Sequence, residues 1–261
     1  MRASALATLA LLASCRGPEP AARLGEATAP TSPATSTGAP SAAEPRALTV
    51  AWEGAADGDG PLLVLLHGYG APADDLVPLA RELCARVPDL RVALPAAPLR
   101  IGGGRAWWPI DLGGARPADR GGHRPRGLDD AARDLAAALD AIGAPPERTV
   151  VAGFSQGGML ATELGLSRRP RLAGLASLSG GPLDEARWVA RARDAPPILL
   201  AHGRRDPLLS FDAASRLAAR LAEAGAEVTF VPFDGGHAIP ADVIDRLAAF
   251  LARRLARAEG G

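Results

Sequence analysis

Residues 148–160 read RTVVAGFSQGGML, an apolar run rich in β-branched side chains followed by a serine between glycines. The run from Arg148 to Phe154 is typical of a central strand in a parallel sheet. Helix-compatible residues continue directly after Ser155. The stretch therefore predicts a buried strand, a tight turn with Ser155 at its apex, and a helix.

Gly153 and Gly157 stand two residues before and two residues after this serine. A sharp strand-to-helix turn brings two backbone segments close together and strains the apical residue, so side chains at those two positions would clash. The pattern G-x-S-x-G is known to present a nucleophilic hydroxyl at the edge of an α/β-hydrolase sheet. The alternative is that Ser155 only caps the following helix. The strand before it and the helix after it favour the nucleophile.

Residues 1–14, MRASALATLALLAS, have the form of a signal peptide. Arg2 gives a positive start, and the apolar run that follows is too short to span a bilayer as a helix. The segment ends in Leu-Ala-Ser-Cys, which resembles the lipobox of bacterial lipoproteins. That resemblance implies cleavage before Cys15, which would then carry lipid and anchor the protein to a membrane. The alternative is an ordinary secretory signal with a cysteine nearby.

Residues 15–46 contain few large apolar side chains and many Pro, Ala, Ser, Thr and Gly, so we expect a flexible linker. Residues 47–261 remain for one domain. We expect an exported protein held at the bacterial cell envelope, on the periplasmic side of either membrane or at the cell surface. Net charge is balanced, with 29 basic and 29 acidic side chains, which gives no case for nucleic-acid binding. The oligomeric state stays open.

Strand-like and helix-like segments alternate along this domain, which predicts an α/β fold with a mostly parallel sheet and helices on both faces. A long segment, residues 95–125, shows no regular pattern and is expected to be irregular. We expect strands near residues 48–52, 62–67, 91–94, 148–154, 172–178, 198–201 and 228–233. We expect the main helices near residues 74–86, 128–142, 211–224 and 241–257, with a further helix directly after Ser155.

A serine hydroxyl needs a base to take its proton and a carboxylate to orient that base. Functional side chains in such sheets gather at the carboxyl ends of strands, and α/β hydrolases use the order nucleophile, acid, histidine. His237 lies just beyond the last expected strand and fits the base. His67 is interpreted as a structural residue that hydrogen-bonds within its turn, and His202 as packing within its loop. His123 lies in the irregular segment.

Asp206 is the expected acid, because it follows the strand near 198–201 and precedes His237. Asp184, Asp212 and Asp234 compete with it. Asp212 is better explained as part of the first turn of the next helix, and Asp234 is very close to His237 in sequence.

Two backbone N–H groups are expected to stabilise the oxyanion. The hydrolase fold places one in the loop after the first apolar strand and the other directly after the nucleophile. These positions are Tyr69 and Gln156.

Four segments carry a family resemblance: LHGYGAPADD (66–75), GFSQGGMLA (153–161), LAHGRRDPLL (200–209) and PFDGGHAIP (232–240). In this order and spacing they resemble the phospholipase/carboxylesterase family of α/β hydrolases, over about residues 60–255. The resemblance implies hydrolysis of carboxylic esters, and in some members thioesters or lysophospholipids, with no cofactor and no metal. It also implies the triad Ser155, Asp206 and His237.

One segment departs from the family pattern, since Trp107-Trp108-Pro109-Ile110-Asp111 stands where members carry a shorter loop. One interpretation is a lid in which Trp107, Trp108 and Ile110 cover an apolar acyl group. The other is that the tryptophans pack on the domain and the rest is a solvated loop. Both stay open.

Alternative functions keep the fold and change the ester: polyester depolymerase, feruloyl esterase or a dienelactone-type hydrolase. Dienelactone hydrolases use cysteine at the turn, so Ser155 weighs against that branch. A non-catalytic envelope lipoprotein is the remaining alternative, although a binding module has no need of nucleophile, acid and base together.

Overall fold

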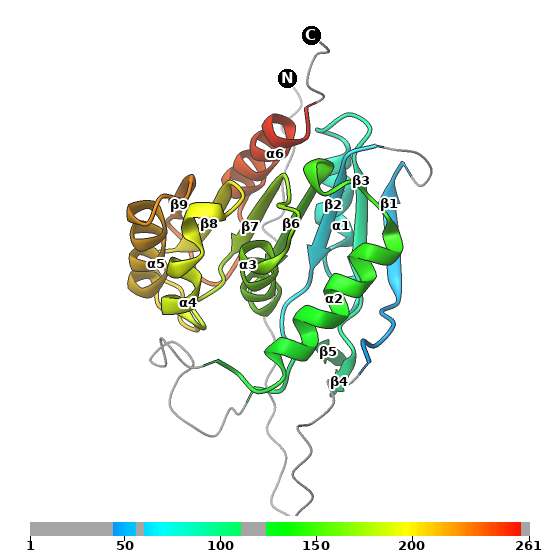
Figure 1. Ribbon diagram of the computed structural model, residues 1–261, viewed down its shortest axis with the longest axis horizontal. Helices are drawn as coiled ribbons and strands as arrows, with labels where there is room; N and C mark the ends of the chain where they lie inside the picture. The colour runs from blue at the N-terminus through cyan, green and yellow to red at the C-terminus, as the bar shows by residue number, and fades with distance from the viewer. Residues whose placement is uncertain (1–43, 56–59, 111–123, 257–261) are drawn as a thin grey trace, which may run out of the picture.

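Seven short segments form one sheet in the order β1-β3-β2-β6-β7-β8-β9 (Figure 1). The structure is a computed structural model, and it describes residues 44–55, 60–110 and 124–256. β1 pairs antiparallel with β3, and the other neighbouring strands are parallel. The strands are β1 (Val50–Gly54), β2 (Leu62–Leu66), β3 (Arg91–Pro95), β6 (Thr149–Phe154), β7 (Gly174–Leu178), β8 (Ile198–Gly203) and β9 (Val228–Phe233).

The inner strands are apolar along their whole length because both of their faces are covered. β2 reads LLVLL, and all five of its residues are buried. Leu63 and Leu65 pack in one core cluster, whereas Leu62, Val64 and Leu66 pack in another on the opposite face. The edge strands β1 and β9 are only partly buried. Continuous apolar runs therefore mark the centre of this parallel sheet.

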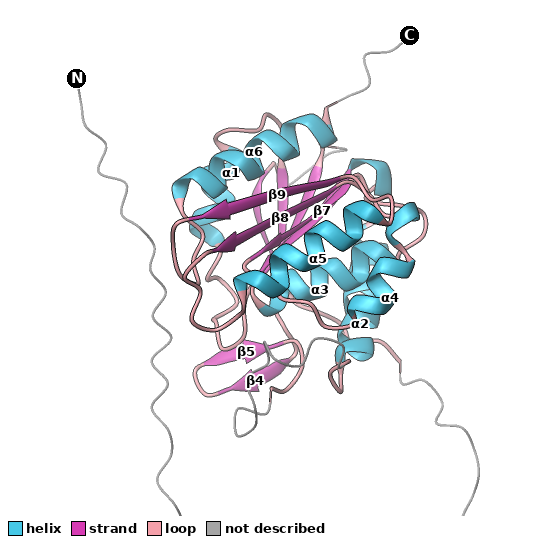
Figure 2. Ribbon diagram, turned by 90° about the vertical axis from the view of Figure 1, so that its left-hand side faces the viewer, coloured by secondary structure: helices cyan, strands magenta, loops and turns pink. Residues whose placement is uncertain are grey.

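Helices cover both faces of the sheet (Figure 2). One face carries α1 (Val77–Cys84) and α6 (Ala241–Leu255). The other carries α2 (Leu128–Ile142), α3 (Gln156–Ser167), α4 (Glu185–Ala190) and α5 (Phe211–Glu223). The two layers enclose the sheet, as the alternating sequence pattern predicts.

α2 has the predicted bounds because glycines terminate it at both ends. Gly127 before it and Gly143 after it have φ values of 92° and 70°, a region that favours glycine. Asp129 and Asp130 in its first turn interact favourably with the helix dipole. α1 is shorter than predicted and begins at Val77, with a proline in its first turn.

The segment after β3 is not irregular throughout, which corrects the expectation for residues 95–125. It forms a hairpin of β4 (Leu99–Ile101) and β5 (Gly104–Ala106). Backbone hydrogen bonds fasten this hairpin to the loop after β2, from Gly70 N to Arg105 O at 2.8 Å and from Arg105 N to Ala71 O at 2.9 Å. Residues 111–123 lie outside the described residues.

The expected linker ends in a contact with the domain. Arg46 donates from its backbone N to Asp134 Oδ1 and from its Nε to Asp134 Oδ2, both at 2.7 Å. Asp134 lies on α2 and is 2% exposed, so this ion pair fixes the chain just before β1. The expected signal peptide, Cys15 and most of the linker lie outside the described residues.

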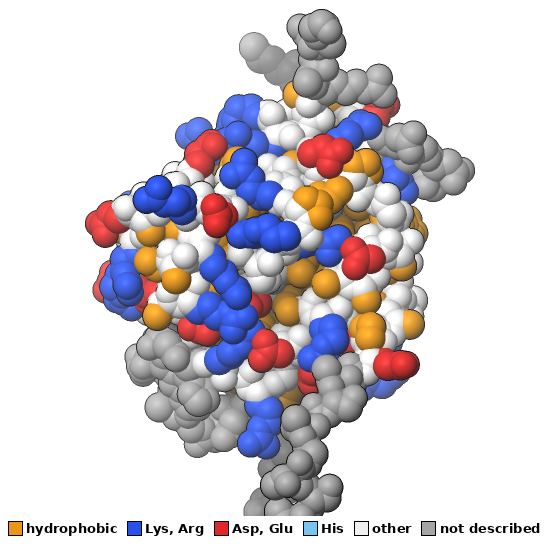
Figure 3. Space-filling view, viewed as in Figure 1, with side chains coloured by type: hydrophobic (Ala, Val, Ile, Leu, Met, Phe, Trp, Pro, Cys, Tyr) orange, Lys and Arg blue, Asp and Glu red, His pale blue; other side chains and the backbone are white. Residues whose placement is uncertain are grey.

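The surface over α2 and α3 carries both signs of charge. On the face shown in Figure 3, arginines lie among aspartates and glutamates. Arg168, for example, pairs with Asp140 at 2.6 Å. Of the helices that the structure describes, none is long and apolar enough to cross a membrane.

Candidate active site

Ser155 stands at the turn between β6 and α3 in a strained backbone conformation. Its φ of 54° and ψ of −117° lie in a region that non-glycine residues rarely occupy. Its backbone N donates to Leu178 O of β7 at 2.9 Å, which holds the turn against the neighbouring strand. The predicted strand, turn and helix are therefore present.

The two flanking glycines are required by close backbone contacts. A Cβ on Gly153 would lie 2.3 Å from Gly157 C, and a Cβ on Gly157 would lie 2.3 Å from Leu66 O. Real side chains do not approach backbone atoms this closely. The turn thus needs glycine two residues before and two residues after Ser155, as the sequence pattern indicates.

Asp206 and His237 meet at the same edge of the sheet, after β8 and β9. His237 Nδ1 lies 2.7 Å from Asp206 Oδ2. The other carboxylate oxygen, Oδ1, accepts hydrogen bonds from Leu208 N at 2.8 Å and from Leu209 N at 3.0 Å. The carboxylate is thus held on both oxygens, and one of them faces the imidazole.

The surroundings of Asp206 keep its carboxyl group ionised although its side chain is fully buried. Burial by itself raises the pKa of this carboxyl. The hydrogen bonds from His202, His237 and the Leu209 amide outweigh burial and hold its pKa well below the usual range. A permanent negative charge therefore lies beside the imidazole of His237.

His237 lies against the residue that precedes Ser155. Its ring centroid is 4.8 Å from that of Phe154, and its side chain is 13% exposed. No hydrogen bond joins its Nε2 to the hydroxyl of Ser155 in this structure, and neither atom bonds to another residue that the structure describes. Since Nδ1 is engaged by Asp206, Nε2 is the nitrogen left to exchange a proton.

The competing carboxylates have other partners. Asp184 caps α4, accepting a hydrogen bond from Arg187 N at 3.4 Å. Asp212 lies in the first turn of α5. Asp234 is 78% exposed and lies 3.7 Å from Arg204. Among these candidates only Asp206 contacts His237.

Tyr69 and Gln156 both lie next to Ser155. The loop after β2 passes directly beside the serine, since a Cβ on Gly68 would lie 3.4 Å from Ser155 Cβ. Gln156 is the first residue of α3. Neither the Tyr69 N–H nor the Gln156 N–H donates to another described residue. Two unpaired donors near a serine suit an oxyanion.

The side chain of Gln156 has a second contact that the sequence did not indicate. Its Oε1 accepts a hydrogen bond from Trp107 N at 2.9 Å, and its Nε2 donates to Trp108 O at 2.8 Å. The side chain is buried. The residue after Ser155 therefore also fixes the backbone of the tryptophan segment.

Trp107 and Trp108 are core residues, only 1% and 2% exposed. They pack with Leu66, Leu128 and other side chains of the cluster between the sheet and α2 and α3. Trp107 Nε1 donates to His67 O at 3.0 Å. Of the two interpretations, packing on the domain describes these tryptophans, and the lid interpretation is wrong for their side chains. Ile110 packs partly buried against the same cluster.

His67 stabilises the loop that carries Tyr69, as predicted. Its Nε2 accepts a hydrogen bond from Ala97 N at 3.1 Å, so Nδ1 carries the proton and donates to Gly68 O at 2.9 Å. Burial lowers the pKa of His67, which favours this neutral form.

His202 does more than pack within its loop. Its Nε2 lies 3.2 Å from Leu209 O and 3.3 Å from Asp206 Oδ2. The sequence interpretation missed this contact, because it depends on how the chain turns between the end of β8 and Asp206. His123 lies outside the described residues.

Within the described ranges, no group of three or more His, Cys, Asp or Glu side chains is placed to hold a metal ion. Cys84 is a free, partly buried thiol whose Sγ lies 3.7 Å from Leu90 O. Burial raises its pKa, so the thiol stays protonated at neutral pH.

Comparison with known proteins gives concordant matches. Acyl-protein thioesterase 1 of Mycosarcoma maydis is 32% identical over 216 residues, which cover 72% of this chain and 89% of that protein. The protein of the same name from Neurospora crassa is 32% identical over 119 residues, 43% of this chain and 49% of that protein. In that match the chain spans about half the length of the curated relative.

The crystal structure of esterase PE8 superimposes with a TM-score of 0.72 at 31% identity, covering 80% of this chain and all of that one. A family model described as Phospholipase/Carboxylesterase matches residues 53–255. The sheet order, the strained serine turn and this match agree. The chain has the α/β-hydrolase fold and belongs to the phospholipase/carboxylesterase family.

Proposed function

We propose that this protein is a serine hydrolase that cleaves carboxylic esters through an acyl-enzyme intermediate. The observation that carries the proposal is the 2.7 Å contact between His237 Nδ1 and Asp206 Oδ2, beside the strained turn at Ser155. Strain at a partly buried polar residue, close to an oriented imidazole, is typical of a nucleophile.

In the first half of the reaction, His237 Nε2 takes the proton of the Ser155 hydroxyl as Oγ attacks the acyl carbonyl carbon. The carbonyl oxygen becomes an oxyanion and accepts hydrogen bonds from the amides of Tyr69 and Gln156. The tetrahedral intermediate then collapses, and the leaving alcohol or thiol takes the proton from Nε2. The acyl group is left on Ser155.

In the second half, His237 Nε2 removes a proton from water as the water oxygen attacks the acyl carbon. The bond from that carbon to Ser155 Oγ then breaks, Oγ takes the proton back from Nε2, and the carboxylic acid leaves. An imidazolium forms in both halves. The buried negative charge of Asp206 stabilises that imidazolium, and its hydrogen bond to Nδ1 keeps the ring in one orientation. No step needs a cofactor.

Apolar side chains of α3 and of the loop after Asp206 support the proposal of an apolar acyl group. Met159 and Leu209 approach one another across Gly181, where a Cβ would lie 3.6 Å from each side chain. Leu208, two residues after Asp206, is 58% exposed and is the more exposed of the two large hydrophobic side chains that reach the surface among the described residues. We propose that Leu208 contributes to the surface that receives the acyl chain. Thioester and lysophospholipid substrates belong to the same proposal, and the thioesterase relatives favour including thioesters.

A fluorophosphonate probe tests the mechanism directly, because it reacts with activated serines. Labelling is expected at Ser155 of the folded protein and is expected to vanish in Ser155→Ala. A panel of p-nitrophenyl esters, acyl thioesters, lysophospholipids and feruloyl esters then defines the substrate class. Folded protein that neither reacts with the probe nor hydrolyses any member of the panel would refute the proposal.

We also propose that the protein is exported and anchored by lipid at Cys15. The support is the sequence alone: an apolar leader, a Leu-Ala-Ser-Cys site and a Pro- and Ala-rich tether. The wild-type chain is expected in the membrane fraction of a bacterial host, and Cys15→Ser in the supernatant. Complete sedimentation of Cys15→Ser with membranes would contradict the anchor.

A further inference from the structure

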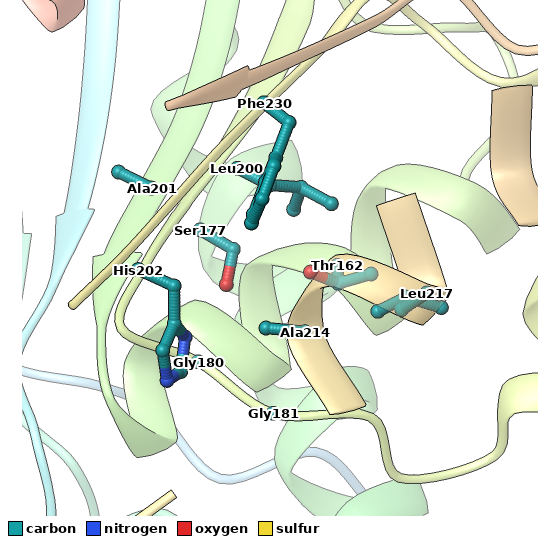
Figure 4. A pocket seen from close by; sticks show the side chains of 10 residues that line it. All are labelled: Thr162, Ser177, Gly180, Gly181, Leu200, Ala201, His202, Ala214, Leu217 and Phe230. Carbon is teal, nitrogen blue, oxygen red and sulfur yellow. The ribbon is translucent and has the colours of Figure 1, made fainter. Parts of the chain in front are cut away.

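A small cavity lies beside His202, among strands β7, β8 and β9 and helices α3 and α5 (Figure 4). Its volume is about 10 Å³, room for one water molecule. The hydroxyl of Ser177 and the imidazole of His202 face this space, and Leu200 and Phe230 close it on the strand side. His202 is thus a polar side chain in an otherwise largely apolar setting.

The two ring nitrogens of His202 have different surroundings. Nε2 lies within 3.3 Å of two acceptors, Leu209 O and Asp206 Oδ2, so it carries a proton and donates. Nδ1 is buried and has no hydrogen-bond partner among the protein groups that the structure describes. A buried N–H without an acceptor is costly, so Nδ1 carries the lone pair. The Nε2–H of His202 is therefore shared between the backbone carbonyl of Leu209 and the carboxylate of Asp206.

We propose that His202 is a positioning residue for the Asp206–His237 pair, whose Nε2–H takes up part of the negative charge on Asp206 Oδ2 and so sets how strongly that oxygen attracts the proton on His237. His202 acts through Asp206 and does not touch the substrate. This inference rests on the proposed function, because it assigns a role within the same site. It goes beyond a triad, since it adds a fourth side chain to the charge network.

The arrangement of donors around Asp206 explains why His202 matters. Oδ1 is fixed by the backbone amides of Leu208 and Leu209. Oδ2 has only the two imidazoles, His237 at 2.7 Å and His202 at 3.3 Å. Without His202, the whole charge on Oδ2 would face His237. That change stabilises the imidazolium form of His237 and weakens the drive to release its proton.

Other groups around His202 do not supply this effect. Ser177 of β7 and Thr162 of α3 do not titrate, and α5 contributes Ala214 and Leu217. The Arg204 guanidinium lies 5.1 Å from the Phe211 ring, whose centroid is 6.4 Å from that of the His202 imidazole. Asp206 and His237 are the titratable groups that this network connects.

The test replaces His202 in the full chain and follows the pH dependence of kcat/KM on a p-nitrophenyl ester. In His202→Leu we expect the acid limb to move to higher pH by about half a unit, or about 0.7 kcal/mol, which is a fraction of the energy of one hydrogen bond to a charged group because His202 acts on His237 only through Asp206. The plateau of kcat is expected to fall less than tenfold, because the two amides still hold Oδ1. His202→Gln, which restores an N–H donor, is expected to return the limb toward the wild-type position.

Leu200→Ala is the matched control, because Leu200 lines the same cavity and has no polar side-chain atom. It is expected to lower Tm while leaving the acid limb in place. A limb that stays unmoved in His202→Leu, beside a similar loss of Tm, would overturn the proposal and leave His202 a packing residue. A limb that moves to lower pH, or a loss of kcat above a hundredfold, would also overturn it, since Asp206 would then have left His237.

A second readout separates this inference from the proposed function. The NMR titration midpoint of His237 in a Ser155→Ala background needs no turnover. It is expected to rise by the same half unit when His202→Leu is added. A protein without hydrolase activity would refute the proposed function, whereas an unmoved midpoint would refute the role of His202 alone.

Discussion

The backbone N–H of Trp107 donates a hydrogen bond of 2.9 Å to the side-chain oxygen of Gln156, 49 residues further along the chain. The same side chain donates to Trp108 O, so one amide group satisfies two buried backbone groups. The backbone N–H of Gln156 is also a proposed oxyanion donor. The donor next to the nucleophile and the tryptophan segment are therefore positioned by one residue.

Replacing Gln156 by Met is expected to damage both features. Methionine fills a similar volume but leaves the Trp107 N–H and the Trp108 carbonyl unsatisfied, at a cost of about 3 kcal/mol in the free energy of unfolding. We expect kcat to fall at least tenfold, because α3 and the tryptophan segment are no longer held together. Urea unfolding and ester hydrolysis measure the two effects.

Thr162→Val is the control for this change, because Thr162 is also buried on α3 and, among the residues that the structure describes, its hydroxyl bonds only to Gly158 O within the helix. It is expected to alter kcat less than twofold. Wild-type kcat in Gln156→Met would contradict the positioning role of the side chain.

Gly157→Ala is expected to prevent stable folding. The new methyl group would lie 2.3 Å from the backbone O of Leu66, the last residue of β2, and 2.7 Å from the backbone O of His67, the next residue. Neither atom moves without displacing β2, so we expect a loss of about 3 kcal/mol or more. Thermal unfolding and the soluble yield report it.

Gly103→Ala is the matched control, since a Cβ there meets nothing within 4 Å and the residue lies in the β4–β5 turn. A change within about 0.5 kcal/mol is expected. A stable, soluble Gly157→Ala protein would show that the turn has more room than its backbone contacts indicate.

Most of the fold and of the candidate site was predicted from two features of the sequence, which are the periodic patterns of apolar residues and the positions where the expected strands end. Continuous apolar runs predicted β2 and β6, and the 3.6-residue spacing predicted α2 with its bounds. Asp206 and His237 were predicted because each follows a strand in the order that the fold requires. The structure brings the two within hydrogen-bond distance, and their catalytic roles stay predictions.

Contacts that depend on tertiary packing, and that leave no periodic pattern in the sequence, were not predicted. The β4–β5 hairpin consists of two three-residue strands in a Gly- and Arg-rich segment, which is too short to show a pattern. The burial of Trp107 and Trp108 depends on that hairpin being fastened to the loop after β2, a tertiary effect. The contact of His202 with Asp206 depends on how the chain turns after β8.

Asp206→Asn is expected to lower kcat by about 10³- to 10⁴-fold with little change in fold. The Leu208 and Leu209 amides need an acceptor, so the asparagine oxygen faces them and its NH₂ faces His237. Nδ1 of His237 must then accept a hydrogen bond, which places the ring proton on Nε2. That tautomer is unable to take the proton of Ser155. Steady-state kinetics and the rate of fluorophosphonate labelling measure the loss.

Asp234→Asn is the control for Asp206→Asn, because its exposed carboxylate lies three residues before His237 and pairs only with Arg204 among the described residues. Activity within twofold of wild type is expected. A similar loss in both variants would mean that general electrostatics, rather than the hydrogen bond to Nδ1, governs the rate.

Glu163 is expected to make stability depend on pH in the acid range. Burial raises the pKa of this carboxylate, but hydrogen bonds from Arg124 at 3.0 Å and from Trp188 Nε1 at 2.7 Å outweigh it and lower the pKa. The stabilisation is therefore present above the unfolded pKa, about 4.3, and is lost as the pH falls through the lower folded pKa. Glu163→Gln should cost about 3 kcal/mol at pH 7 and progressively less towards pH 3.

Urea unfolding at a series of pH values checks this, with Asp140→Asn as the control. Asp140 pairs with Arg168 but is 68% exposed, and exposed pairs contribute about 1 kcal/mol or less. The free energy of unfolding of the wild type should therefore approach that of Glu163→Gln as the pH falls. Its difference from that of Asp140→Asn should stay nearly constant with pH. If Glu163→Gln lowered the free energy of unfolding by the same amount at pH 7 and at pH 3, the loss would come from packing and not from the charge of Glu163.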